Sequence, residues 1–136
     1  MKYGIYYAYW TQEWGGAYSP FIPRVKRLGF DVLEIACGNF HLESDTFFQE
    51  LKRISESEGV ILTGGYGPRP EHNLASADSA AVESTFRFYA DVFRKMELAG
   101  IRTLGGALYS YWPVDFRSGF DKEDDLTRSI SGMKRL

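Results

Sequence analysis

Hydrophobic and polar residues alternate along the chain in four units, each an apolar segment followed by a polar stretch with helical periodicity. Three polar stretches end in a glycine that an apolar residue follows at once, at Gly29, Gly59 and Gly100. Glycine ends a helix at C′ because it enters the left-handed region without steric cost. The pattern therefore predicts three helix-to-strand connections in a repeating strand–helix order.

The apolar segments predict four strands, at residues 3–10, 30–36, 60–64 and 101–108. Several of them are apolar almost throughout, which is typical of parallel strands that are buried on both faces.

Three polar stretches carry apolar stripes at helical spacing, each expected to bury one face against a sheet. The stripes are Phe47, Leu51 and Ile54 after a candidate cap at Ser44; Val82, Phe86, Tyr89, Phe93 and Met96 after a candidate cap at Ser76; and Leu126, Ile130 and Met133 within residues 121–136. A further helix after Ser19 contains Pro20, which suits a first turn, and Pro23, whose ring begins to obstruct the hydrogen-bond ladder. We expect that helix to start late or to be distorted.

The predicted order is (βα)4 with right-handed crossovers. A doubly wound sheet and half of a (β/α)8 barrel both fit. No G-x-G-x-x-G follows the first strand, and the long aromatic segments all follow strands, which favours the N-terminal half of a TIM barrel. Such a barrel takes roughly 250 residues, and the last helix runs into GMKRL without a cap. We therefore expect residues 1–136 to be the N-terminal half of a single, larger barrel domain.

Composition narrows the classes of function. Hydrophobic residues make up 44% of the chain, enough to fill a core. A net charge of −2 offers no basic surface for nucleic acid or an anionic membrane. No apolar run approaches the ~18 residues of a membrane span, and no signal peptide is evident, so we expect a cytoplasmic protein. The single Cys37 excludes an intramolecular disulfide.

Aromatic residues and glycines gather after the first, third and fourth predicted strands, where a barrel has its functional loops. They suit a ligand with C–H faces, such as a sugar, or they simply close one end of the barrel. Glu34 is either a base or ligand near the barrel mouth, or half of an internal ion pair, or a residue low in the barrel. His41 and His72 lack metal-ligand spacing and are interpreted as loop histidines.

Four segments resemble the ketose 3-epimerases, the D-tagatose and D-psicose (D-allulose) 3-epimerase group of the xylose-isomerase-like barrels. They are MKYGIYYAYW with Glu13 and Trp14 after it, LGFDVLEIA, ILTGGYGP and LGGALYSYWPVDF. The similarity runs in order through nearly the whole chain. The first helix departs from the family pattern at Pro23.

The resemblance implies a metal-dependent epimerase of free ketohexoses such as D-tagatose, D-psicose and D-fructose. One glutamate would remove the C3 proton, a second would reprotonate the opposite face of the enediolate, and a manganese, cobalt or magnesium ion would stabilise the oxyanion. The family's metal ligands and catalytic glutamates lie on later strands, so we expect no catalytic residue and no metal ligand in this chain. The resemblance assigns substrate-binding roles to Tyr6, Trp14, Tyr66, Ala107, Leu108 and Trp112.

We therefore expect this chain to supply pocket wall only and to be inactive alone, with a small-molecule ketose as ligand. It would form a homo-oligomer or pair with a complementing C-terminal half. Two alternatives stay open: another sugar isomerase of the same superfamily, and a non-enzymatic half-barrel that pairs with another chain.

Overall fold

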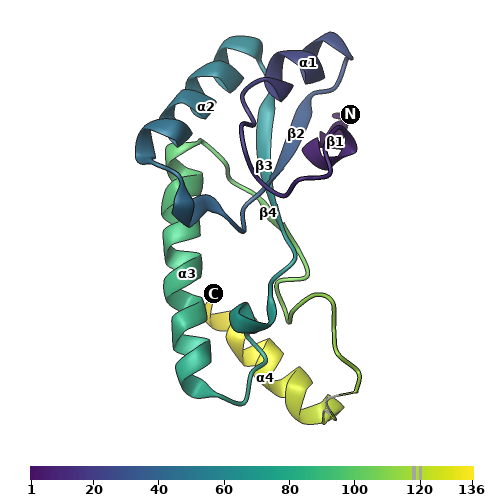
Figure 1. Ribbon diagram of the computed structural model, residues 1–136, viewed down its shortest axis with the longest axis vertical. Helices are drawn as coiled ribbons and strands as arrows, with labels where there is room; N and C mark the ends of the chain where they lie inside the picture. The colour runs from purple at the N-terminus through teal and green to yellow at the C-terminus, as the bar shows by residue number, and fades with distance from the viewer. Residues whose placement is uncertain (118, 120) are drawn as a thin grey trace. The chain divides into compact units, whose positions relative to one another are not determined.

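The computed structural model describes residues 1–117, 119 and 121–136. Strands and helices alternate along it (Figure 1). The strands are β1 (Gly4–Tyr6), β2 (Val32–Ala36), β3 (Ile61–Tyr66) and β4 (Leu104–Gly106). The helices are α1 (Phe21–Arg27), α2 (Asp45–Glu58), α3 (Ser79–Leu98) and α4 (Lys122–Arg135), and three 3-10 turns are η1 (Tyr7–Tyr9), η2 (Phe40–Leu42) and η3 (Pro70–His72).

The strands form one sheet in the order β1-β2-β3-β4. β2 is parallel to both β1 and β3, and Tyr6 pairs with Glu34, which in turn pairs with Thr63. This arrangement confirms the predicted (βα)4 fold, the N-terminal half of a (β/α)8 barrel. The prediction that the chain belongs to one barrel domain stays a prediction.

The first and last strands are shorter than the apolar runs that predicted them. Residues 3–10 contain a three-residue strand followed by η1, and residues 101–108 contain only β4. In residues 3–10, apolar character beyond the strand reflects packing in the core, because Tyr7 in the turn after β1 is fully buried. Apolar character alone does not distinguish such a buried turn from a strand.

The described residues divide into two compact units. Unit 1 comprises residues 1–65 and 91–105, and unit 2 comprises residues 66–90 and 106–136. Each unit is described by itself below.

In unit 1, α1 and α2 pack together, and α1 packs on β2 (Figure 1). Leu33 and Ile35 of β2 are fully buried, whereas Val32, Glu34 and Ala36 are half-buried. Side chains alternate between the two faces of a strand, so Leu33 and Ile35 point to the helices. We call the other face of the sheet, which carries Glu34, the open face.

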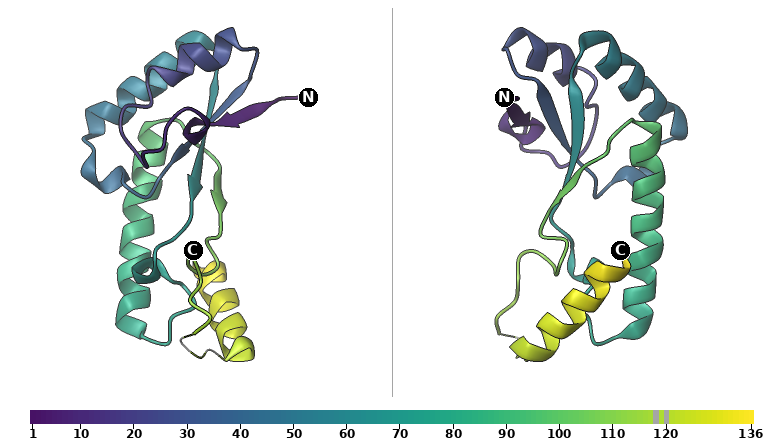
Figure 2. Two further views of the ribbon diagram at one scale, coloured as in Figure 1. Left: turned by 45° about the vertical axis from the view of Figure 1, so that its right-hand side comes forward. Right: turned by 180° about the vertical axis from the view of Figure 1, so that it is seen from behind.

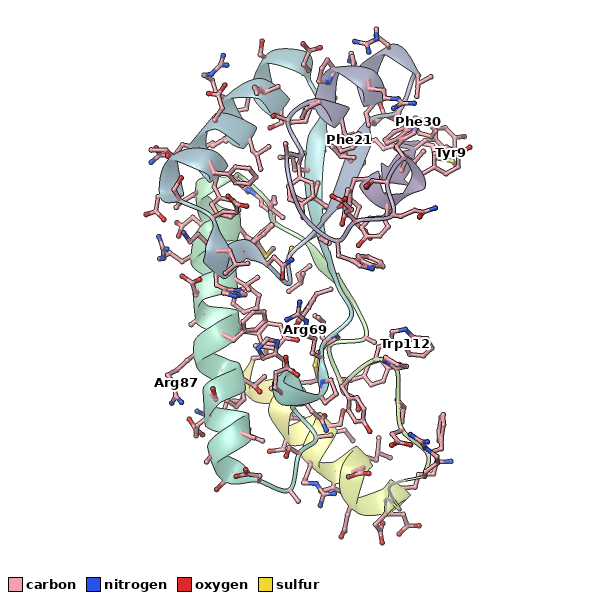
Figure 3. The ribbon with its side chains drawn as sticks, viewed as in Figure 1. Tyr9, Phe21, Phe30, Arg69, Arg87 and Trp112 are labelled. Atoms are coloured by element: carbon pink, nitrogen blue, oxygen red, sulfur yellow. The ribbon has the colours of Figure 1, made fainter. Side chains whose placement is uncertain are left out.

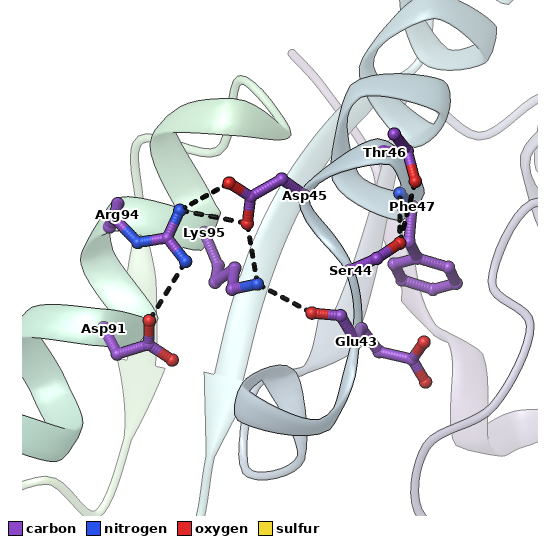
Figure 4. Close-up of polar contacts among 8 residues, drawn as sticks. All are labelled: Glu43, Ser44, Asp45, Thr46, Phe47, Asp91, Arg94 and Lys95. Carbon is purple, nitrogen blue, oxygen red and sulfur yellow. Dashed lines mark hydrogen bonds and ion pairs between the residues drawn. The ribbon is translucent and has the colours of Figure 1, made fainter.

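A polar cluster ties the start of α2 to the end of α3 within unit 1 (Figure 4). Lys95 Nζ donates to the Glu43 carbonyl at 2.6 Å and to Asp45 Oδ1 at 2.8 Å. Arg94 Nη1 contacts both carboxylate oxygens of Asp45 at 2.9 and 3.0 Å, and Nη2 donates to Asp91 at 3.2 Å. The Lys95 ammonium is buried and donates to these two acceptors.

The predicted helix ends are largely confirmed. Gly29, Gly59 and Gly100 adopt φ of 83°, 64° and 71° after their helices. Ser44 caps α2 by accepting from the Phe47 N–H at 3.3 Å. The predicted cap at Ser76 is wrong, since α3 begins three residues later and Asp78 Oδ1 accepts from the Ala80 N–H at 2.9 Å.

Helix α1 begins directly after Pro20, without the late start expected from Pro23. Pro23 is the third residue of the helix. The first four N–H groups of a helix have no partner within it, so a proline there removes no hydrogen bond.

In unit 2, the C-terminal end of α4 approaches the N-terminal half of α3 (Figure 2). Arg135 forms an ion pair with Glu83 and its guanidinium lies 3.9 Å from the Phe86 ring centroid. Gly132 packs so closely on Leu74 that an added Cβ would lie 2.9 Å from Leu74 Cβ.

The expectation that Leu126, Ile130 and Met133 bury one face of the last helix is wrong. Their exposed fractions are 58%, 47% and 39%. The buried residues of α4 are Ser129 and Gly132, because small residues allow its close approach to Leu74. The spacing of these residues shows that one face of the helix is apolar. It does not show which segment, if any, covers that face. None of the helices in the described part of the chain has the length and apolarity needed to cross a bilayer.

Candidate functional site

The first group of predicted site residues stands at the end of β1 in unit 1. Tyr6 is the last residue of β1, and its ring centroid lies 6.1 Å from that of Trp14 at an interplanar angle of 46°. The Trp14 side chain is exposed, and Tyr6 is half-buried. The structure therefore brings these two predicted residues together as one aromatic surface.

Three hydrogen bonds hold the loop that carries Trp14. The hydroxyl of the fully buried Tyr7 accepts from the Gly15 N–H at 2.9 Å and donates to the Glu13 carbonyl at 3.1 Å. Asn39 Nδ2 donates to the Trp14 carbonyl at 3.0 Å. Sequence reasoning missed the role of Tyr7, because in a run of tyrosines only the turn after the strand shows which one points inward.

Glu34 shares the open face with Tyr6, since the two residues pair directly across β1 and β2. The carboxyl group also lies over Gly65: an added Cβ there would stand 2.7 Å from Glu34 Oε1. Burial raises the pKa of Glu34 above its ordinary value. Burial is likewise the largest cause of the raised Tyr6 pKa, and Glu34 adds to it.

The expected alternative for Glu34, an internal ion pair, is absent from the described residues. No Lys, Arg or His of this part of the chain lies within salt-bridge distance of its carboxylate. This half-buried carboxyl group is therefore not neutralised by the described part of the chain.

The second group of predicted site residues belongs to unit 2. Tyr66, at the end of β3, is largely buried. A hydrogen bond of 2.5 Å joins its hydroxyl to His72 Nδ1. The His72 ring stacks on the Phe88 ring, with 3.7 Å between the ring centroids. Burial raises the pKa of Tyr66. This histidine thus takes part in a hydrogen-bonded loop, as the sequence indicated.

Gly106 allows the chain to pass closely beside Tyr66. Its φ is 119°, and an added Cβ would lie 1.9 Å from the Tyr66 carbonyl oxygen. Ala107 and Leu108 follow directly and are half-buried. Only glycine fits here, for reasons of both backbone conformation and space.

Trp112 lies on the segment after β4, and its side chain is exposed (Figure 3). The Trp112 N–H donates to the Pro68 carbonyl at 2.7 Å. This bond ties the segment after β4 to the segment after β3, so unit 2 brings Trp112 next to the chain that follows Tyr66.

Metal ligation and nucleophilic catalysis find no support among the described residues. No group of three or more His, Cys, Asp and Glu side chains there could hold a metal ion, so this part of the chain does not fit the divalent cation that the resemblance implies. Cys37 is fully buried, and burial raises the pKa of its thiol to about 12. A thiol that stays protonated at neutral pH is a poor nucleophile.

No family model matches the chain. It is 45% identical over 138 residues to the D-psicose 3-epimerase of Enterocloster bolteae and 42% identical over 136 residues to that of Ruminiclostridium cellulolyticum. Each match covers 100% of this chain and 46% of the relative. The chain thus spans about half the length of the curated relatives it matches.

Solved structures give the same result. The D-psicose 3-epimerase with D-tagatose from Clostridium cellulolyticum H10 superposes with a TM-score of 0.96 at 42% identity, over 99% of this chain and 47% of the other. D-allulose 3-epimerase from Methylomonas sp. shares the fold, with a TM-score of 0.81 at 18% identity over 99% and 46% of the two chains. By sequence and fold the chain is similar to the N-terminal half of the ketose 3-epimerases.

Proposed function

We propose that this chain forms the non-reacting wall of the sugar pocket of a ketose 3-epimerase, which inverts C3 of a free ketohexose. The observation that carries the proposal is the aromatic surface of Tyr6 and Trp14 at the end of β1, in a chain 45% identical to a D-psicose 3-epimerase. Flat aromatic faces bind the C–H faces of a sugar and tolerate several ketoses. D-Psicose, D-tagatose and D-fructose are the expected ligands.

The resemblance assigns pocket-wall roles to residues of each unit. They are Tyr6 and Trp14 in unit 1, and Tyr66, Ala107, Leu108 and Trp112 in unit 2. Tyr66 contributes its ring rather than its hydroxyl, because the hydroxyl is engaged by His72. Trp112 and Trp14 present exposed indole rings that a ligand can reach.

This chain supplies neither the acid nor the base of the reaction, nor the ligands of a divalent cation. The described residues contain no suitable ligand cluster, and Glu34 is a single carboxyl group where the two-base chemistry needs a pair. We therefore propose that catalysis requires a complementing C-terminal half, with homo-oligomers as a further level of assembly.

A chimera tests the proposal. Residues 1–136 are joined to the C-terminal half of the Enterocloster bolteae D-psicose 3-epimerase, and D-psicose and D-fructose are followed by chromatography with Mn²⁺, Co²⁺ or Mg²⁺. We expect the chimera to interconvert the two ketoses, and the isolated chain to be inactive.

The C-terminal half alone and the parent enzyme are the controls. A folded chimera that leaves ketoses unchanged while the parent converts them would contradict the proposal. Turnover only between aldose and ketose would instead identify a sugar isomerase, and epimerisation by the isolated chain would disprove the division of roles.

A further inference from the structure

Glu34 occupies the middle of the open face in unit 1. It pairs with Tyr6 of β1 on one side and with Thr63 of β3 on the other. Paired residues of parallel strands point to the same face of the sheet. The carboxyl group thus stands in one row with a phenol and a hydroxyl, beside the ring that contacts Trp14.

The space for this carboxyl group depends on Gly65. The Glu34 side chain reaches over Gly65, where an added Cβ would lie 2.7 Å from Oε1 and 3.2 Å from Cδ. Any larger residue at position 65 would push the carboxyl group aside. The absence of a side chain there leaves the carboxyl group its present place on the open face.

Within the described residues, Glu34 makes no salt bridge, and its carboxylate has no hydrogen-bond donor among the contacts on the open face. Burial penalises the ionised form and raises its pKa. A half-buried carboxylate without a donor costs free energy that a bound hydroxyl or N–H group would recover. Its strand partners Tyr6 and Thr63 and the adjacent Gly65 carry no positive charge.

We propose that the Glu34 carboxylate accepts a hydrogen bond from a hydroxyl group of the ketose that packs on Tyr6 and Trp14. This inference rests on the proposed function and makes Glu34 a sugar-binding residue of the pocket wall. An ionised carboxylate is an acceptor only, so it selects a hydroxyl donor. Aromatic surface for C–H groups beside a single carboxylate for a hydroxyl is a combination that suits a carbohydrate.

The position of Glu34 also predicts that its loss affects sugar binding more than the chemical step. Glu34 would fix the orientation of a sugar that the aromatic rings hold loosely. Loss of the carboxylate should therefore weaken binding, while the chemical step, carried by other residues, continues once the sugar is bound.

The test measures KM and kcat for D-psicose in the chimera described above. A hydrogen bond to a charged acceptor is worth about 10- to 100-fold in affinity, so we expect Glu34→Leu to raise KM by about tenfold or more with a smaller change in kcat. Glu34→Gln, which keeps the size and one acceptor oxygen, should have an intermediate effect. Glu56→Gln, the same change at an exposed position of α2, is the control.

A second measurement reports on Glu34 itself. In the isolated chain, the carboxyl ¹³C resonance of Glu34 is titrated with pH, with and without D-psicose, while tryptophan fluorescence reports binding. A hydroxyl that donates to the ionised form lowers the carboxyl pKa, so we expect the titration midpoint to fall when the sugar is present.

The outcomes separate the two proposals. If the chimera is active but the Glu34 variants match the Glu56→Gln control, and bound sugar leaves the Glu34 midpoint unchanged, this inference is wrong and the pocket stands. If neither the chimera nor the chain binds a ketose, the proposed function fails and Glu34 loses its role with it. If Glu34→Leu disturbs the sheet, Glu34→Gln still tests the inference, because it keeps the size of the side chain.

Discussion

Tyr6 and Glu34 face the same side of the sheet because they pair directly across β1 and β2. The pairing places a carboxyl group beside the aromatic surface at the strand ends. A shift of one residue in register would move Glu34 to the helix-covered face, where Leu33 and Ile35 are completely buried. Register, and not composition, therefore places this carboxyl group on the open face.

Tyr7 should stabilise the loop that carries Trp14. Tyr7→Phe removes the hydroxyl that contacts the Gly15 N–H and the Glu13 carbonyl. Because the position is fully buried, we expect the free energy of unfolding to fall by about 1–3 kcal/mol, measured by urea denaturation. Tyr9→Phe, at an exposed tyrosine, should leave it unchanged; equal effects of both variants would contradict the role of Tyr7.

Asp45 should make folding stability depend on acid pH. Hydrogen bonds from Lys95 and Arg94 lower the pKa of Asp45 below its ordinary value of 3.8. A carboxyl with a depressed folded-state pKa contributes stability above its unfolded pKa and loses it as the pH falls through the folded value. Because ordinary carboxyl pKa values lie near about 4, we expect thermal melts between about pH 6 and 2 to show this loss of stability in acid.

The same melts on Asp45→Asn give the comparison. The variant should be less stable near neutral pH, with a smaller further loss in acid. Glu13→Gln, at an exposed carboxylate for which no ion pair is seen in the described chain, serves as the control. Parallel pH curves for Asp45→Asn and the unsubstituted chain would disprove the contribution of the cluster.

Gly106 should not tolerate a side chain. Gly106→Ala combines a φ of 119° with a Cβ that would lie 1.9 Å from the Tyr66 carbonyl oxygen. Backbone strain of this kind costs about 1–3 kcal/mol, and the steric overlap adds to it. Gly16→Ala, at φ of 93° with nothing within 4 Å of the added atom, isolates the backbone contribution, so urea denaturation should show the greater loss for Gly106→Ala.

Cys37 should resist alkylation in the folded chain. Burial raises the pKa of its thiol to about 12, and the thiolate is the reactive species. We expect iodoacetamide at about pH 8, near the ordinary thiol pKa, to modify Cys37 only after denaturant unfolds the chain, as followed by mass spectrometry. Rapid modification without denaturant would show that the thiol is accessible and ionised.

Local patterns predicted the fold better than they predicted burial. Glycine at C′ and the Ser44 cap act through the backbone of neighbouring residues, so the sequence suffices to locate them. The stripe of Leu126, Ile130 and Met133 shows the limit, because its burial depends on segments distant in the sequence. Likewise the resemblance assigned Tyr66 to the pocket wall but did not indicate its hydrogen bond with His72.

The amino-acid sequence by itself determined the strand–helix order and the parallel (βα)4 class, because periodicity, caps and turn glycines are local signals. Four sequence segments also carried the resemblance to the ketose 3-epimerases. Only the tertiary structure decided that Glu34 lies beside Tyr6 and over Gly65, that Tyr7 rather than Tyr6 holds the Trp14 loop, and that α4 packs through Gly132. These relationships depend on strand register and on the close approach of segments far apart in the chain, which residue types alone do not specify.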